Sequence, residues 1–426
     1  MRNFEPGRAF AEEKDRLDSL ASLREHFYTK ENQIYMDGNS LGLCSKDAEK
    51  AVLRALSDWK EYGINLWTGA EVGYFVYYDV LGEKLARLIG AQPDEVTVCG
   101  NTTLNVHQCI ATFWKPTEER YKILIDALNF PTDRYAVYSQ IQSRGMDPEK
   151  VLKVVESRDG KTISEDDIIE AMTDDVAVAL FPSVLYRSAQ LLDMKRLTEA
   201  AHKKGIIIGF DLCHSIGNVD HNFAEIDCDY ALWCNYKYLS GGPGATAGLY
   251  INRRHFELEP GLAGWWGNKT ETQFELRDDF DHAHNAGGWQ TGTGTILSMA
   301  AIDGALDIYN GVDMADVRAK SLDLTAYLMY LIEKDLAPYG FTIGNPRDDA
   351  HRGGHVALEH PDAVRINEAL KNAGVVPDFR YPNVIRLAPV PLYVRYTDVY
   401  DLVAILKDIM DTKAYTAYSN KTGTVA

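Results

Sequence analysis

Six short apolar runs recur through the middle of the chain, and each is followed by a polar or glycine-rich segment. Several runs are apolar at nearly every position, as expected of strands covered on both faces. Helical stretches of a dozen or more residues separate several of them, which is the length that crossovers between parallel strands need. The pattern predicts an α/β fold with a mostly parallel central sheet. The expected strands are residues 95–100, 122–127, 176–182, 205–211, 230–235 and 247–253.

The pattern changes on either side of this region. Residues 1–35 are predicted to form a helical arm. After about residue 300 come two helical stretches, 297–309 and 315–334, and then weaker strands and helices over 340–412, which predict a smaller α+β domain. The predicted units are an N-terminal arm over residues 1–50, a large α/β domain over 51–305 and a small C-terminal α+β domain over 306–426.

Charge and composition exclude several classes of partner. The chain has 426 residues, with 44 Lys and Arg against 62 Asp and Glu, a net charge of −18. This charge repels phosphate backbones and anionic lipid surfaces, so we expect neither a nucleic-acid nor a membrane partner. The charged N-terminal stretch lacks the apolar core of a signal peptide, and no segment has the apolar length of a transmembrane helix. We expect a cytoplasmic protein.

The six cysteines predict neither a disulfide framework nor a metal site. They form no CxxC pair, and their spacing from the histidines matches no zinc pattern. Reduced, buried thiols are the expected state. Cys234 is the last cysteine of the chain.

Polar side chains follow the predicted strands, at the sheet edge where ligands bind in open α/β folds. Thr102 and Thr103 come after the first run, at the start of a predicted helix, where hydroxyl and backbone N–H groups suit an anion. Phe130 follows the second run, and Asp211 ends the fourth. The alternative for the threonines and for Asp211 is an ordinary helix cap.

Lys237 stands in the segment ALWCNYKYLSGG, among aromatic residues rather than among other charges. A lysine in such surroundings is costly unless it is paired or used. Pyridoxal 5′-phosphate needs an amine, an anion site, a carboxylate for its ring nitrogen and a flat apolar group for its ring face. Lys237, the threonine pair, Asp211 and Phe130 could supply these groups. The alternative is a lysine that extends to solvent at a domain edge.

Longer motifs resemble the kynureninase family, fold-type I pyridoxal-phosphate enzymes related to the class V aminotransferases. The matching segments are DGNSLGL (37–43), FPTD (130–133), GFDLCHSIGNV (209–219), NYKYLSGGPGATAGLYI (235–251), PGLAGWWG (260–267) and VIRLAPVPLY (384–393). The resemblance implies hydrolytic cleavage of the Cβ–Cγ bond of L-kynurenine, giving anthranilate and L-alanine, in tryptophan catabolism. It also implies a homodimer.

The resemblance also implies roles for single residues. Lys237 would be the Schiff-base lysine, and Arg386 would bind the substrate α-carboxylate. Tyr236 would hold phosphate or donate a proton. The other cofactor-binding residues that it implies are Thr102, Thr103, Phe130, Asp133, Asp211, His214 and Trp265 with Thr293, the last two from the partner subunit.

Two features separate the alternatives that remain. Relatives that prefer the 3-hydroxylated substrate carry asparagine at the position of Thr293, so plain kynurenine is the expected substrate, with 3-hydroxykynurenine as a second one.

Cysteine desulfurases and selenocysteine lyases need a mobile cysteine in a late loop, and none follows Cys234. An aminotransferase and a catalytically silent relative stay as further alternatives. Pro182 stands where relatives often have serine, so a polar contact there is not expected.

Overall fold

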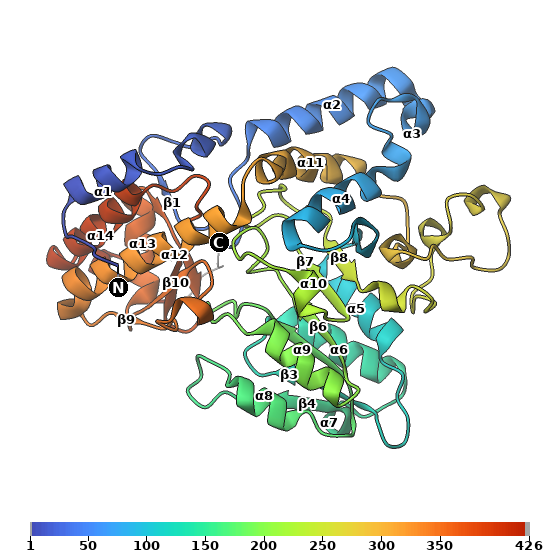
Figure 1. Ribbon diagram of the computed structural model, residues 1–426. Coiled ribbons are helices and arrows are strands. Elements are labelled where there is room, and N and C mark those ends of the chain that lie inside the picture. Colours follow the sequence, from blue (N-terminus) through green and yellow to red (C-terminus); the bar gives the residue numbers. More distant parts are fainter. Residues whose placement is uncertain (1, 422–426) are drawn as a thin grey trace.

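The computed structural model describes residues 2–421, which form a large α/β domain with a smaller domain beside it (Figure 1). A seven-stranded sheet crosses the large domain in the order β2-β8-β7-β6-β5-β3-β4. Its strands are β2 (Val96–Val98), β3 (Lys122–Asp126), β4 (Leu152–Val155), β5 (Val176–Pro182), β6 (Ile207–Asp211), β7 (Tyr230–Trp233) and β8 (Gly248–Ile251). All six predicted strands are present.

The sheet is mostly parallel, as predicted, with one exception. Strands β3 to β7 run parallel to one another, whereas β8 is antiparallel to both β7 and β2. The segment between β7 and β8 contains no helix, so the chain turns back instead of crossing over. Strand β4 was not predicted, because it is a half-exposed edge strand that contains Lys153.

Both faces of this sheet are covered, so alternate residues of one strand serve two cores. Ile123 and Ile125 of β3 pack with α5 and α6 on one face, and Leu124 packs on the opposite face. The helices of the large domain and its N-terminal flank are α2 (Lys46–Tyr62), α3 (Leu66–Gly69), α4 (Tyr77–Ile89), α5 (Thr102–Phe113), α6 (Pro131–Ser143), α7 (Pro148–Val151), α8 (Glu165–Ala171), α9 (Met194–Lys203), α10 (Phe223–Ile226) and α11 (Ile296–Asn310).

The smaller domain is built on a four-stranded antiparallel sheet in the order β12-β13-β10-β9. Its elements are α12 (Met314–Leu331), β9 (Thr342–Ile343), β10 (Val356–Glu359), α13 (Ala363–Asn372), β11 (Val375–Val376), β12 (Asp378–Arg380), β13 (Val384–Leu387) and α14 (Tyr396–Asp411). The predicted α+β character of this region is confirmed. No helix within residues 2–421 is long and apolar enough to span a membrane.

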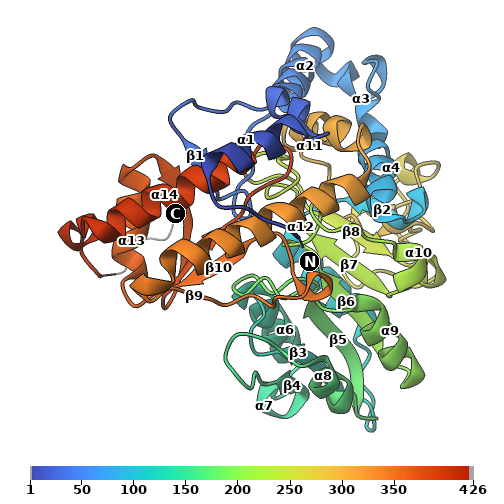
Figure 2. The ribbon, with the colours of Figure 1, turned by 60° about the vertical axis from the view of Figure 1, so that its left-hand side comes forward.

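The N-terminal arm lies against this smaller domain rather than against the large sheet (Figure 2). Helix α1 (Arg8–Arg16) packs along α14, and β1 (Ile34–Tyr35) pairs in parallel with β11. The arm is helical over Arg8–Arg16 and, as a short 3-10 helix, over Ala21–His26, so the prediction of a helical arm over residues 1–35 is right only in part. From β1 the chain passes directly between the two domains.

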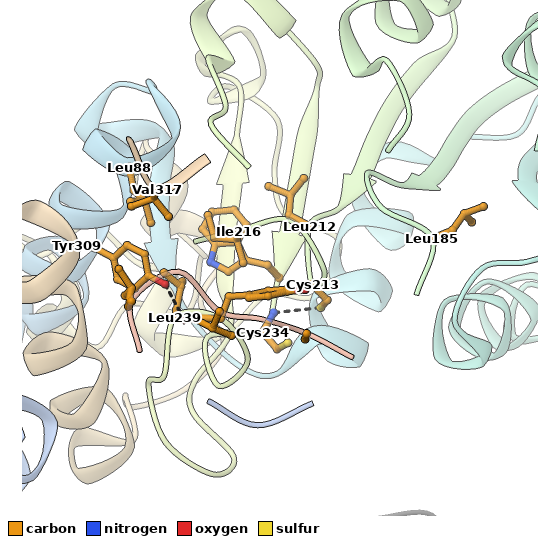
Figure 3. Close-up of a cluster of buried hydrophobic side chains, with 14 of the residues drawn as sticks. Leu88, Leu185, Leu212, Cys213, Ile216, Cys234, Leu239, Tyr309 and Val317 are labelled. Atoms are coloured by element: carbon orange, nitrogen blue, oxygen red, sulfur yellow. Dashed lines mark hydrogen bonds between the residues drawn. The ribbon is translucent and has the colours of Figure 1, made fainter. Parts of the chain in front are cut away.

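A buried cluster ties together the loops that follow β6 and β7 (Figure 3). The Tyr309 hydroxyl of α11 donates to the backbone oxygen of Tyr238 at 2.7 Å and contacts that of Gly217 at 3.1 Å. The backbone N–H of Cys234 donates to Cys213 Sγ at 3.2 Å. These contacts fix two loops that carry predicted site residues.

Candidate active site

A cavity of about 230 Å³ lies where the large sheet, the N-terminal segment and the smaller domain meet. The residues that line it are Asn39, Ser40, Thr102, Thr103, Phe130, Thr132, Asp211, Cys213, His214, Tyr236, Lys237, Arg380 and Arg386. Most of the residues predicted from the sequence are among them. The carboxyl ends of β6 and β7 open into this cavity, which is the expected place for a ligand in such a sheet.

Lys237 points into the cavity from the loop that follows β7. Its Nζ lies 2.9 Å from His214 Nε2 and 5.9 Å from the centre of the Phe130 ring. Asn235 holds the loop, because its side chain donates to Thr246 O at 2.6 Å and its backbone oxygen accepts from Gly241 N at 2.8 Å. The geometry contradicts the alternative of a lysine extended to solvent.

His214 is a neutral base in contact with this amine. Burial, followed by the charges of Lys237 and Arg386, holds the pKa of His214 well below its usual range. Its Nδ1 is buried and has no hydrogen-bond partner within residues 2–421. The imidazole therefore accepts or donates one hydrogen bond toward Lys237 without carrying a charge of its own.

Two carboxylates lie together near the lysine. Asp211 Oδ1 accepts from the backbone N–H of Cys213 at 2.7 Å. Asp133 is fully buried, and burial together with the neighbouring Asp211 raises the pKa of Asp133 well above its usual value. Neither oxygen of Asp133 finds a donor among the described residues. Asp133 does not line the cavity, so Asp211 is the carboxylate of this pair that a ligand in the cavity can contact.

The threonine pair is free to bind an anion because another residue caps the helix. Asn101, not a threonine, caps α5: its side-chain oxygen accepts from Leu104 N at 2.9 Å. Thr103 Oγ1 lies 2.6 Å from Thr132 Oγ1, at the N-terminal turn where backbone N–H groups face outward. Thr102 Oγ1 contacts Cys213 Sγ at 3.6 Å. The alternative that these threonines are ordinary caps is wrong.

Arg386 enters the cavity from β13 of the smaller domain. It is 1% exposed, and its guanidinium group pairs with Asp378. Its Nη1 donates to Tyr186 O at 2.7 Å, and its Nη2 donates to Ser40 Oγ at 3.0 Å. This arginine lines the same cavity as Lys237 and the threonines, where its guanidinium group can bind a carboxylate.

Known proteins resemble this chain along its whole length. The family of the kynureninase C-terminal domain matches residues 317–406. The kynureninase of Bacillus anthracis is 53% identical over 423 residues, covering 99% of each chain. That of Geobacillus thermodenitrificans (strain NG80-2) is 51% identical over 423 residues, with the same coverage. The chain belongs to the kynureninase family.

Solved structures with low sequence identity share the fold. A C-DES mutant with glycine covalently linked to its PLP cofactor aligns at a TM-score of 0.76 and 15% identity, covering 90% of this chain and 99% of that one. A cysteine desulfurase from Thermococcus onnurineus NA1 aligns at 0.77 and 14% identity, covering 92% and 98%. The fold class predicted from the sequence is confirmed.

Two residues that the resemblance to kynureninases implied lie away from this cavity. Trp265 is 43% exposed, and its indole N–H donates to Gln273 O at 3.0 Å. Thr293 is exposed, and neither residue belongs to the cavity wall that residues 2–421 form. That they reach a site in a second subunit stays a prediction.

The cavity of this kynureninase-family chain also contains residues that no prediction named. Asn39, Ser40, Thr132 and Cys213 lie inside segments whose motifs were recognised, so the motifs marked the right stretches but not these side chains. Arg380 had no such signal. It reaches the cavity only because β12 pairs with β13.

Proposed function

We propose that this protein hydrolyses L-kynurenine to anthranilate and L-alanine with pyridoxal 5′-phosphate as cofactor. The observation that carries the proposal is the arrangement around one cavity of an amine, a carboxylate and an arginine: Lys237, Asp211 and Arg386. The carboxyl group of Asp133 lies buried beside Asp211. Family membership at 53% identity over 99% of the chain supports the same reaction.

The residues present fit the cofactor group by group. Lys237 would hold its aldehyde carbon, and Asp211 would face its ring nitrogen, with Asp133 buried beside Asp211. The hydroxyls of Thr102 and Thr103 would hold its phosphate at the start of α5. When bound, the cofactor supplies an electron sink that stabilises negative charge at the substrate Cα.

The remaining residues bind the substrate and move its protons. Arg386 fixes the substrate carboxylate, which turns the Cα–H bond toward Lys237. The Lys237 amine removes the Cα proton, and neutral His214 keeps that amine in place through its 2.9 Å contact. Water adds to the γ-carbonyl, and the Cβ–Cγ bond breaks with release of anthranilate.

Tyr236 is the acid that we assign to proton transfer at Cβ, whereas Lys237 returns to Cα the proton that it removed. It lines the cavity beside Lys237, and burial raises the pKa of its phenol above the usual value. The phenol therefore stays protonated at neutral pH and can donate to Cβ of the departing alanine. Its other role is to hold phosphate together with the threonines.

The decisive experiment replaces the lysine. Lys237→Ala is expected to abolish the release of anthranilate, which is followed by its fluorescence, and of alanine. Lys195→Ala, at a 52% exposed side chain on α9, serves as the control and should keep full activity. Alanine release without any added keto acid separates hydrolysis from amino transfer. Anthranilate formation by Lys237→Ala at the wild-type rate would overturn the proposal. The same assay compares kynurenine, the expected substrate, with 3-hydroxykynurenine.

We further propose that the protein acts as a homodimer. Trp265 and Thr293 are exposed and outside the cavity, which supports their use by a second subunit. An open apolar groove of about 510 Å³ supports a subunit contact on the same side of the large domain, since Trp59 is 57% and Leu297 44% exposed there. The cytoplasmic location stays a prediction.

A further inference from the structure

Three charged side chains share one face of the small sheet, where it meets the cavity. Asp378 and Arg380 are alternate residues of β12, so both project to the same side. Asp378 is the cross-strand partner of Arg386 on β13, which adds the second arginine to that side. Both arginines line the cavity, although the site as derived above uses only Arg386.

The Ser40 hydroxyl lies between the two guanidinium groups. Arg386 Nη2 donates to Ser40 Oγ at 3.0 Å, and Arg380 Nη2 donates to the same oxygen at 3.3 Å. One neutral oxygen thus accepts from two cations. A carboxylate oxygen at this place would form charge-assisted hydrogen bonds with both groups, which are about twice as strong as neutral ones.

Asp378 fixes both guanidinium groups in this orientation. Its side chain is fully buried, and Oδ2 accepts from Arg386 and, at 3.1 Å, from Arg380 Nε. The Nη2 atoms of both arginines thus reach Ser40, while Arg386 Nη1 is held by Tyr186 O and Arg386 Nη2 also pairs with Asp378. Asp37 is the other acid near this cluster, and burial followed by repulsion from Asp378 raises the pKa of Asp37 to about 6.

We propose that Arg380 is a second carboxylate-binding arginine, so that the substrate α-carboxylate lies between Arg380 and Arg386 and takes over the bonds that Ser40 now accepts. Asp378 is the positioning residue for both. The proposal rests on the proposed function, because it assumes an amino-acid substrate in this cavity. Arg380 then recognises the carboxylate of the substrate and not its aryl ketone.

The test measures binding of two inert ligands to the holoenzyme by calorimetry. Benzoylpropanoate keeps the aryl ketone and the carboxylate of the substrate but has no amine, and benzoylpropanamide lacks the charge as well. Arg380→Gln is expected to weaken binding of the acid about tenfold to a hundredfold and to leave binding of the amide unchanged. Arg380→Lys should retain part of the preference for the acid.

Arg347→Gln is the matched control, because Arg347 is a half-exposed arginine of the same domain that pairs with Glu333 at the surface. If the Arg380→Gln variant prefers the acid over the amide as strongly as the wild type does, the proposal is overturned. An equal loss of acid and amide binding in both Arg380 variants would also overturn the proposal, because it would show that Arg380 has only a structural role. A wild-type enzyme that binds acid and amide equally would instead contradict the proposed carboxylate site of Arg386.

Discussion

The buried carboxyl group of Asp126 makes the stability of the fold depend on pH. Asp126, at the end of β3, is 2% exposed, and its Oδ1 accepts from Leu128 N at 2.8 Å. Its Oδ2 has no partner in the part of the chain that the structure describes. Burial raises the pKa of Asp126 to about 7. The folded protein thus holds this proton more tightly than the unfolded chain does, in which an aspartate has a pKa of about 4.

The sign of the pH effect follows from this difference. Between about pH 4 and pH 7 the unfolded state releases the proton first, so Asp126 lowers the free energy of unfolding as pH rises. Asp126→Asn can keep the hydrogen bond from Leu128 N, and its amide group does not ionise. The free energy of unfolding of this variant at pH 8 should therefore exceed that of the wild type by on the order of 1 to 3 kcal/mol. Urea unfolding at pH 5 and pH 8 measures it. The control is Asp174→Asn, at a side chain that is 90% exposed; equal pH slopes for Asp126→Asn and wild type would refute the prediction.

The site residues predicted from the sequence were those that follow strands. Asp211 and Lys237 come directly after buried apolar runs, so the direction of the strand alone placed them at one edge. Arg380 and Ser40 are 340 positions apart and meet through sheet pairing, which local sequence does not encode. Trp265 and Thr293 lie outside the cavity wall of the described residues, and their proposed use would need a second chain. Local pattern thus identifies the residues that one sheet edge gathers, and misses those that tertiary pairing adds.

At the scale of elements, the segment of residues 37–43 lies directly over the lysine loop. Gly42 N donates to Tyr236 O at 2.8 Å, and a Cβ at Gly42 would overlap the backbone oxygen of Lys237 and the side chain of Ser240. Glycine is required here by close approach of two backbones. The segment therefore fixes the position of the loop that carries Lys237.

Gly42→Ala is expected to displace that loop. The overlap involves backbone, so we expect a loss of about 2 to 4 kcal/mol in the free energy of unfolding and at least about a tenfold fall in kcat. Gly69→Ala is the control, because its added Cβ meets Tyr62 at an ordinary 3.5 Å. Thermal unfolding and steady-state assays on both variants measure the difference. Normal kcat in Gly42→Ala would show that the loop does not depend on this contact.

At the scale of the whole molecule, the proposed homodimer predicts that two defective chains restore one another. Lys237→Ala and Trp265→Ala should each lose activity alone. If Trp265 serves the partner's site, each mixed dimer has one intact site of two, so co-expression in equal amounts restores about a quarter of wild-type activity. The activity of the co-expressed mixture measures it, and mixed dimers purified from that mixture should show about half of the wild-type activity.

The matched control combines two variants of the same chain's site. Lys237→Ala with Asp211→Ala leaves no intact site in any dimer, so no activity should return. A mixture of Lys237→Ala and Trp265→Ala that stays as inactive as its parents would contradict a shared site.

The pairing of β1 with β11 joins residues near the beginning of the chain to residues near its end. Translation proceeds from the N-terminus, so the ribosome releases β1 and the segment of residues 37–43 long before their partner strand exists. The wall that contains Ser40 closes only after β12 and β13 have emerged. The cavity wall is therefore incomplete until β12 and β13 have folded, and a chain that lacks them would carry Lys237 and Asp211 without the two arginines that line the same cavity.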